Sequence, residues 1–378
     1  MRLPSFRCLA AAACLVCSGL WSAPADALTV QLDYTYDNGF FTNVAVNPDA
    51  DAARAALEQA ARSFEMYVDD LETIVPGGVN TWEARFWRPD TGTQGAVADL
   101  VVPAETVIFF AGARDLGESL GVGGPGWASA TGTVEWFDTL RYRGQEGAAE
   151  TPASDFGPWG GTIAFNSEES WSFDLDAPPA GPGESDFYSV ALHEMCHALG
   201  FGIADSWKAH VTGSHEFTGT AATAAFGGPV PLDGIDVHWA EDTLGAIGTV
   251  DVQEAGMDPT LLVGSRKRLT ALDHAGLVDI GWELPSPGDA DHDGDVDVWD
   301  YVTLKRHFNS SGGWEDGDMD FDGDVDYYDY AALRDHFGES SAVPGPPGAP
   351  AGALPEPGML AITSLTALAL LRRRPPRR

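Results

Sequence analysis

The strongest constraint on this chain is the segment His193-Glu194-Met195-Cys196-His197, which fits the pattern H-E-x-x-H. It lies in an apolar run, Phe187 to Leu199, that ends at glycines, and this context predicts an α-helix. Helical positions four apart lie one turn apart on the same face, so both imidazoles can reach one metal ion. Zn²⁺ accepts neutral imidazole nitrogen, and an adjacent carboxylate can act as general base on a metal-bound water. We therefore expect His193 and His197 to be zinc ligands and Glu194 to be the catalytic base.

The third zinc ligand is not fixed by spacing. A catalytic zinc usually has three protein ligands and one open position. In the extended motif H-E-x-x-H-x-x-G-x-x-H the third histidine lies three residues after the glycine, and here that position is Ile203. Either the site is inactive or its third ligand comes from further along the chain. The candidates downstream are Asp205, His210, His215, His238 and His274.

The stretch from Asp186 to Trp282 resembles the leishmanolysin-like branch of the metzincin metallopeptidases, in which an insertion separates the helix from the third histidine. The matching pieces are residues 193–202, Trp207, 217–219, 227–232, 238–241 and 269–282. The resemblance implies that His238 is the third ligand of one catalytic Zn²⁺ and that Met257 is the methionine of the turn beneath the metal. It also implies hydrolysis of peptide bonds in protein or peptide substrates.

Residues 28–284 show the mixed patterning of one catalytic domain. Strands are predicted at 29–36, 81–87, 106–111 and 160–166, and helices at 51–72 and 270–280, while residues 112–160 are rich in Gly, Pro and Trp and are predicted to form surface loops. We expect an α/β (α+β) metzincin-like sandwich with an active-site cleft under one sheet edge. By analogy with the family, strand 161–166 would pair with an extended peptide.

Two acidic loops follow a short linker at residues 285–288. Each has oxygen ligands at positions 1, 3, 5, 9 and 12, a glycine at position 6 and an apolar residue at position 8, as an EF-type calcium loop requires. Each loop runs into a predicted helix, at 301–308 and 330–337. We expect two structural Ca²⁺ ions, held by Asp289, Asp291, Asp293, Asp295, Asp297 and Asp300 and by Asp318, Asp320, Asp322, Asp324, Asp326 and Asp329.

The loop-helix pair at 289–338 resembles the type I dockerin, a small all-α calcium-binding module. The resemblance implies a cohesin-like or other surface partner. Positions 10 and 11 are Val298-Trp299 and Tyr327-Tyr328, bulky where cellulosomal dockerins carry small hydroxyl residues. A calcium-stabilised adhesion or spacer module is therefore the alternative interpretation.

Both ends of the chain read as processing signals. Residues 1–27 have arginines, an apolar core and the cleavage pattern Ala25-Asp26-Ala27 of a secretory signal peptide. After a Pro/Gly-rich linker at 339–353, residues 354–378 carry Pro-Glu-Pro, an apolar run predicted to be a transmembrane helix, and an arginine cluster. This tail resembles the PEP-CTERM sorting signal, which implies an exosortase-type processing enzyme. It also implies a location in the cell envelope, at the outer surface or outside a Gram-negative bacterium.

Charge and cysteine usage narrow the function further. The formal net charge of -36 leaves no basic stripe for phosphate contacts, which argues against a nucleic-acid partner. Only Cys196 lies outside the leader, so no internal disulfide is expected, and a buried core role is favoured for it over a thiolate near zinc.

We predict an exported zinc-dependent metalloendopeptidase with a calcium module. The alternative is a catalytically inactive calcium-stabilised surface or matrix binding protein on a metalloprotease fold; Ile203 favours it and Glu194 argues against it.

Overall fold

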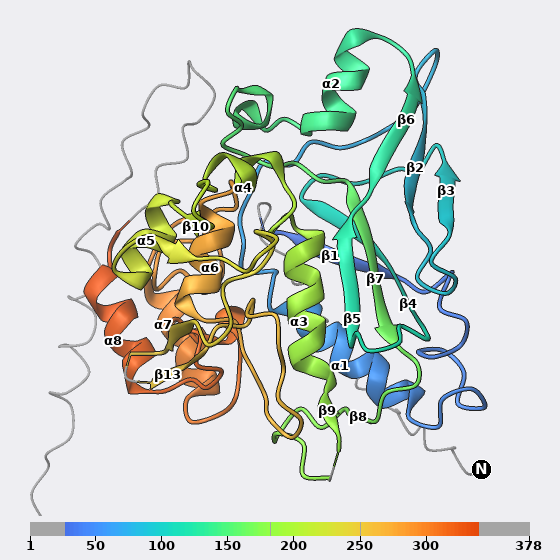
Figure 1. The fold of residues 1–378 in the computed structure, drawn as a ribbon. Coiled ribbons are helices and arrows are strands. Elements are labelled where there is room, and N and C mark those ends of the chain that lie inside the picture. The colour runs from blue at the N-terminus through green and yellow to red at the C-terminus, as the bar shows by residue number, and fades with distance from the viewer. Residues whose placement is uncertain (1–26, 182, 250, 340–378) are drawn as a thin grey trace, which may run out of the picture. The chain divides into compact units, whose positions relative to one another are not determined.

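The computed structural model describes residues 27–181, 183–249 and 251–339 (Figure 1). Within these ranges, no helix has both the length and the apolar character needed to cross a bilayer. The predicted sorting tail, with its apolar helix, and nearly all of the predicted leader lie outside the described residues.

A four-stranded sheet positions the candidate site. Its order is β1 (Thr29–Asp33), β4 (Thr106–Arg114), β7 (Gly160–Asn166) and β5 (Gly121–Pro125). β4 runs parallel to β1 and β7, and β5 is the antiparallel edge strand. The side chains of β4 alternate between two cores on opposite faces of the sheet. Its unbroken apolar sequence is therefore that of a central strand covered on both sides.

Helices cover one face of this sheet and a second sheet covers the other. α1 (Ala50–Arg62) and α3 (Phe187–Ala198) pack against each other on the helical face (Figure 1). The second sheet has the order β3 (Gln94–Ala98), β2 (Thr81–Trp87) and β6 (Trp127–Thr131). Its core joins side chains of β2 and β4 with α2 (Val134–Tyr142). The predicted mixed α/β class is confirmed.

Two sequence-based expectations about this region were wrong. Residues 112–160 are not only loops, because β5, β6, α2 and the 3₁₀ helix η1 (Glu146–Ala149) lie there. β7 is not a sheet edge but lies between β4 and β5, so the edge open to an extended peptide belongs to β5.

The helix predicted to reach residue 72 ends at Arg62. Val68 instead forms β-bridges with Ala27 and Glu283, and Leu71 is buried in the core outside any helix. The three- and four-residue spacing of apolar residues continued past Arg62 because the following turns also face the core.

Short elements fill the interval after α3. They are α4 (Asp205–Ala209), β10 (Glu216–Phe217), α5 (Thr220–Phe226), β11 (Val230–Pro231), β12 (Leu244–Ile247), β13 (Asp251–Glu254) and α6 (Ala271–Val278). β8 (Trp171–Ser172) and β9 (Ser185–Asp186) precede α3. Four aromatic side chains hold the interval together, with ring centroids 4.2–5.5 Å apart for the contacting pairs: Phe201, Trp207, Phe217 and Trp239.

The calcium module consists of α7 (Val298–His307), the 3₁₀ helix η2 (Trp314–Asp316) and α8 (Tyr327–His336). Its own small core holds Val296, Leu304, Val325 and Leu333. The side chains of Asp297 and Asp326 cap α7 and α8, each accepting a backbone N–H two residues on. Both helices begin earlier than predicted, directly after these caps. The predicted small all-α loop-helix pair is confirmed.

Candidate metal centres

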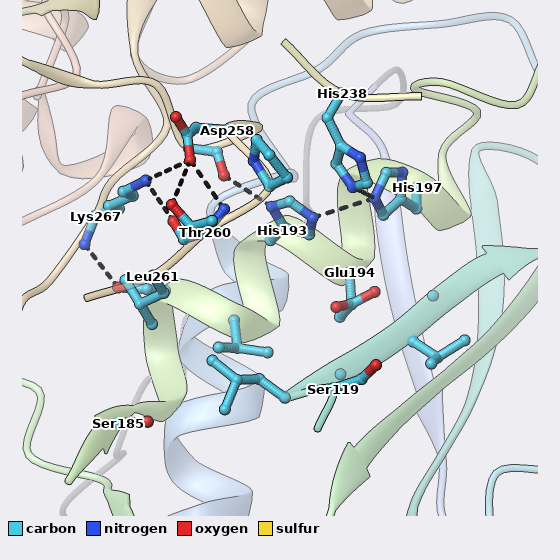
Figure 2. A pocket seen from close by; sticks show the side chains of 18 of the residues that line it. Ser119, Ser185, His193, Glu194, His197, His238, Asp258, Thr260, Leu261 and Lys267 are labelled. Carbon is cyan, nitrogen blue, oxygen red and sulfur yellow. Dashed lines mark hydrogen bonds and ion pairs between the residues drawn. The ribbon is translucent and has the colours of Figure 1, made fainter. Parts of the chain in front are cut away.

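Helix α3 carries the first three candidate residues. His193 and His197 lie one turn apart, and Glu194 directly follows His193 (Figure 2). The helix ends where Gly200 takes a φ of 104°, a left-handed conformation that favours glycine. The turn places the carbonyl oxygen of Phe201 3.0 Å from Nδ1 of His197. The sequence thus ends the helix directly behind its second histidine and uses the turn to orient that ring.

Gly202 brings a distant segment to the end of α3. A Cβ on Gly202 would lie 2.2 Å from the carbonyl oxygen of Val237, so only glycine allows the two backbones to approach this closely. His238 follows Val237, and Trp239 anchors this segment in the aromatic cluster described above. The close approach therefore delivers His238 to the pair on α3.

The three imidazoles converge on one point. Nε2 of His197 lies 3.1 Å from Nε2 of His193 and 3.0 Å from Nε2 of His238 (Figure 2). Three nitrogens bound to one tetrahedral Zn²⁺ at 2.0–2.1 Å would be about 3.3 Å apart. This donor set, its spacing and its geometry fit a zinc ion.

Hydrogen bonds on the other ring nitrogens orient all three imidazoles. Nδ1 of His193 lies 2.8 Å from the carbonyl oxygen of Gly256, and Nδ1 of His238 lies 2.9 Å from Oδ2 of Asp233. With the Phe201 contact, every Nδ1 faces an oxygen acceptor and must donate its hydrogen. Each Nε2 is then left with a lone pair aimed at the shared point, as metal-binding histidines require.

Burial favours the neutral form of these rings. It lowers the pKa of His193 to about 4 and holds the pKa of His197 well below its usual value, helped by the neighbouring imidazoles. Neutral imidazole is the form that binds a metal.

The carboxylate of Glu194 packs against the glycines of β5. A Cβ on Gly121 would lie 2.6 Å from Oε1 of Glu194, and one on Gly123 would lie 2.0 Å from its backbone oxygen. Burial raises the pKa of Glu194 to about 8, and a backbone hydrogen bond from Gly123 opposes part of that rise. A divalent cation at the triad would also lower this pKa, because a nearby positive charge favours the ionised carboxylate.

A cavity of about 700 Å³ opens beside the triad. It is bordered by β5 on one side and by the segment 258–263 on the other, and it runs along α3 past Val190 and Ser189. Ile203, which stands where the extended motif would place a histidine, contributes to its wall.

The acidic loops bring carboxylates together in the module. One group is Asp289, Asp291 and Asp300, and the other is Asp318, Asp320 and Asp322. Burial, reinforced by the neighbouring aspartates, raises the pKa of Asp289 to about 7 and that of Asp318 to about 8. Oxygens of Asp291, Asp318 and Asp320 are buried without a hydrogen-bond partner. Converging oxygens that lack partners fit Ca²⁺, which binds six to eight of them.

Other predicted calcium ligands have roles within the protein or face solvent. Asp297 and Asp326 are the helix caps, and Asp329 accepts backbone N–H groups of its own loop, as Asp300 does. Asp293, Asp295 and Asp324 are exposed, and Asp293 accepts the backbone N–H of Asp295.

Two family models match separate parts of the chain. The matrixin model matches residues 135–217, and the model of the type I dockerin domain matches residues 287–338. The chain carries a matrixin-type zinc metallopeptidase domain. No curated protein and no solved structure is similar enough to the chain to match it. The matrixin match includes α3 but ends before His238, so only the geometry brings that residue to the site.

Sequence reasoning missed one residue of the peptidase domain that supports the triad. Asp273, buried near the start of α6, accepts hydrogen bonds from the backbone N–H groups of Gly256 and Met257 and from Nε1 of Trp239. Gly256 is the acceptor for His193, and Trp239 follows His238. Asp273 therefore links the supports of two imidazoles. The signal that was available is the capping pattern Thr270-x-x-Asp273, which holds in the structure.

Met257 is fully buried and follows Gly256, whose carbonyl oxygen lies 2.8 Å from Nδ1 of His193; its place in a turn beneath the metal stays a prediction. Cys196 is also fully buried, and burial raises the pKa of its thiol, which supports the core role.

The remaining ligand candidates have other partners. His210 bonds the carbonyl oxygen of Asp279, His215 bonds Asp236, and His274 bonds the hydroxyl of Tyr67. Asp205 pairs with Lys208 at the surface. His238 is thus the downstream candidate that the fold brings to the pair.

Proposed function

We propose that this protein is a zinc-dependent endopeptidase in which His193, His197 and His238 hold the metal. The observation that carries the proposal is the convergence of three Nε2 atoms whose Nδ1 partners are all oxygen acceptors. An inactive binding protein was suggested by Ile203, but a third imidazole reaches the site by another route. The retained acid next to the ligands is what hydrolysis needs and what binding alone does not.

A zinc ion held by His193, His197 and His238 would supply an acidic water and a Lewis acid for the scissile carbonyl. Glu194 accepts the proton of the attacking water and passes it to the leaving amine. The carboxylate packs against Gly121 of β5, where a side chain would displace it. The open edge of β5 would pair with an extended peptide, and the adjacent cavity would receive substrate side chains.

Within the metallopeptidases, we assign the catalytic domain to a leishmanolysin-like arrangement. His238 follows His197 by 41 residues, and the interval folds as an insertion around the aromatic cluster. In this arrangement Met257 is the methionine of the turn beneath the metal.

The calcium module would hold two structural Ca²⁺ ions, one in each loop. Its partner would be cohesin-like or another surface protein. The exposed side chains of Val298, Trp299, Tyr327 and Tyr328 at positions 10 and 11 offer it an apolar contact surface. The leader and tail motifs support export and exosortase-type processing, with the mature protein at the cell envelope or outside the cell.

Zinc content and casein hydrolysis test this proposal together. We expect about one zinc per chain in the wild type and in Glu194→Gln, with cleavage lost in the variant. His238→Ala should lose zinc and activity, whereas His210→Ala, a histidine in the same interval but away from the site, should keep both. Zinc binding without Glu194-dependent cleavage would contradict the enzyme and favour a binding protein.

A further inference from the structure

The second calcium loop contacts the peptidase domain directly. The described residues of both belong to one compact unit. The ring of Phe321 stacks on the ring of His274 in α6, with centroids 4.4 Å apart and an interplanar angle of 28°. The backbone N–H of Gly248 donates to the carbonyl oxygen of Asp320 at 3.0 Å. A Cβ on Gly323 would overlap the guanidinium of Arg268, so this arginine covers the loop at its sixth position.

The two loops differ in this respect although their sequences repeat. Phe321 stands at position 4 of the second loop, and its ring also stacks on Trp314 with centroids 5.4 Å apart. Position 4 of the first loop is His292. The ring contact and the backbone hydrogen bond just described both involve the second loop. Ala290 of the first loop also lies in the main hydrophobic core, but the stacked ring and the backbone hydrogen bond to the peptidase domain come from the second loop.

The contacted helix also supports the zinc ligands. His274 follows Asp273, which accepts the N–H groups of Gly256 and Met257. The carbonyl oxygen of Gly256 is the partner of His193. One turn of α6 thus faces the calcium loop on one side and the supports of the metal site on the other.

We propose that calcium binding at the second loop is coupled to the order of the peptidase metal site through Phe321 and helix α6. The coupling itself does not require bound zinc, and only its expected effect on zinc retention rests on the proposed function. Carboxylate oxygens of Asp318 and Asp320 are buried without partners, so like charges oppose closure of the loop unless a cation joins them. An ion that binds the closed, docked loop in preference to an open one shifts the population toward it. Because coupling between two sites is reciprocal, ordering of the metal site would raise the calcium affinity of the second loop by the same factor.

Hydrogen exchange at the amides of Gly256 and Met257 tests the coupling without any zinc. In the zinc-free full-length chain we expect calcium to slow this exchange by about fivefold or more, the lower end of measured couplings between sites. Asp320→Ala should abolish the effect of calcium. The matched variant Asp291→Ala, at the same position of the first loop, should preserve it. Equal exchange with and without calcium in the wild type, or equal loss in both variants, would overturn the proposal.

The variant Phe321→Ala separates calcium binding from docking. It should still bind calcium with the wild-type stoichiometry by titration calorimetry, yet lose the effect on exchange. An undiminished calcium effect in Phe321→Ala would overturn the role given to this ring. In zinc-loaded wild type, calcium should also slow zinc transfer to a chromogenic chelator by a similar factor. Failure to load zinc at all would refute the proposed function and leave the exchange result standing.

Discussion

The carboxylate of Asp273 offers the sharpest test of how the fold supports the metal site. Its Oδ1 accepts Nε1 of Trp239 at 2.9 Å and the N–H of Met257 at 3.0 Å. Its Oδ2 accepts three donors at 2.7 Å, from Gly256 and from the N–H and hydroxyl of Thr270. The substitution Asp273→Asn keeps the shape but replaces one oxygen by an NH₂ group. Whichever oxygen is replaced, at least two donors lose their acceptor.

Each buried donor left unsatisfied costs about 1–3 kcal/mol. Asp273→Asn should therefore lower the free energy of unfolding by about 2–6 kcal/mol, measured by urea denaturation of the zinc-free protein. Because supports of two imidazoles depend on this carboxylate, zinc affinity should also fall about 10- to 100-fold, as for other groups that orient metal ligands. Competition with a zinc-binding dye measures this change.

Asp279→Asn, at the C-cap of the same helix, is the matched control. Asp279 accepts the N–H groups of Ala221 and Ala222, one on each oxygen, so its amide loses a single bond away from the metal site. We expect a loss of about 1 kcal/mol and unchanged zinc affinity. Equal effects of the two substitutions on zinc affinity would refute the role given to Asp273.

Three further predictions follow from burial and close contacts. Gly123→Ala should lower the free energy of unfolding by about 3 kcal/mol or more, because its Cβ would lie 2.0 Å from the backbone of α3. In the control Gly124→Ala the new Cβ has its nearest atom 3.8 Å away, so the free energy of unfolding should change by under about 1 kcal/mol. Similar losses in the two variants would contradict the packing of β5. Cys196 should stay unreactive toward a thiol reagent until the protein is unfolded, because the side chain is fully buried; rapid labelling of the native protein would disprove this. Burial and neighbouring carboxylates raise the pKa of Asp318 to about 8 and of Asp320 to about 7. The calcium-free fold therefore binds more protons than the unfolded chain between about pH 4 and pH 8, so its thermal unfolding midpoint should rise as the pH falls through that window. With saturating calcium the trend should reverse, since protons then compete with the ion.

The features that sequence predicted correctly are those set by local spacing. Two histidines four apart on a helix share a face whatever surrounds them, and the spacing within a calcium loop places its oxygens around one point. The metal helix and the loop-helix pair could therefore be recognised before the fold was known. Their exact ends could not, because Asp297 and Asp326, which the loop pattern predicts to be calcium ligands, act as helix caps.

Strand β5 could not be recognised, because its conformation comes from its neighbours. The run Gly121-Val122-Gly123-Gly124 offers no alternation of apolar and polar side chains, which is the usual sign of a strand. It is extended because β7 pairs with it and α3 packs against it, at distances that exclude a Cβ on Gly121 or Gly123. In the sequence these glycines suggest a loop, but in the fold they allow α3 to pack closely against β5.

The turn at Gly202 accounts both for an isoleucine at position 203 and for a third imidazole that comes from a distant segment. Gly202 takes a φ of 75° and lies against the backbone of Val237. His238 follows Val237, so the third imidazole reaches the pair on α3 from this segment and not from position 203. With the ligand supplied from there, position 203 no longer has to coordinate and instead lines the cavity beside the triad. An apolar side chain is suited to that wall, because it cannot compete with the histidines for the metal. The residue that suggested an inactive site is therefore better explained as part of the substrate cavity.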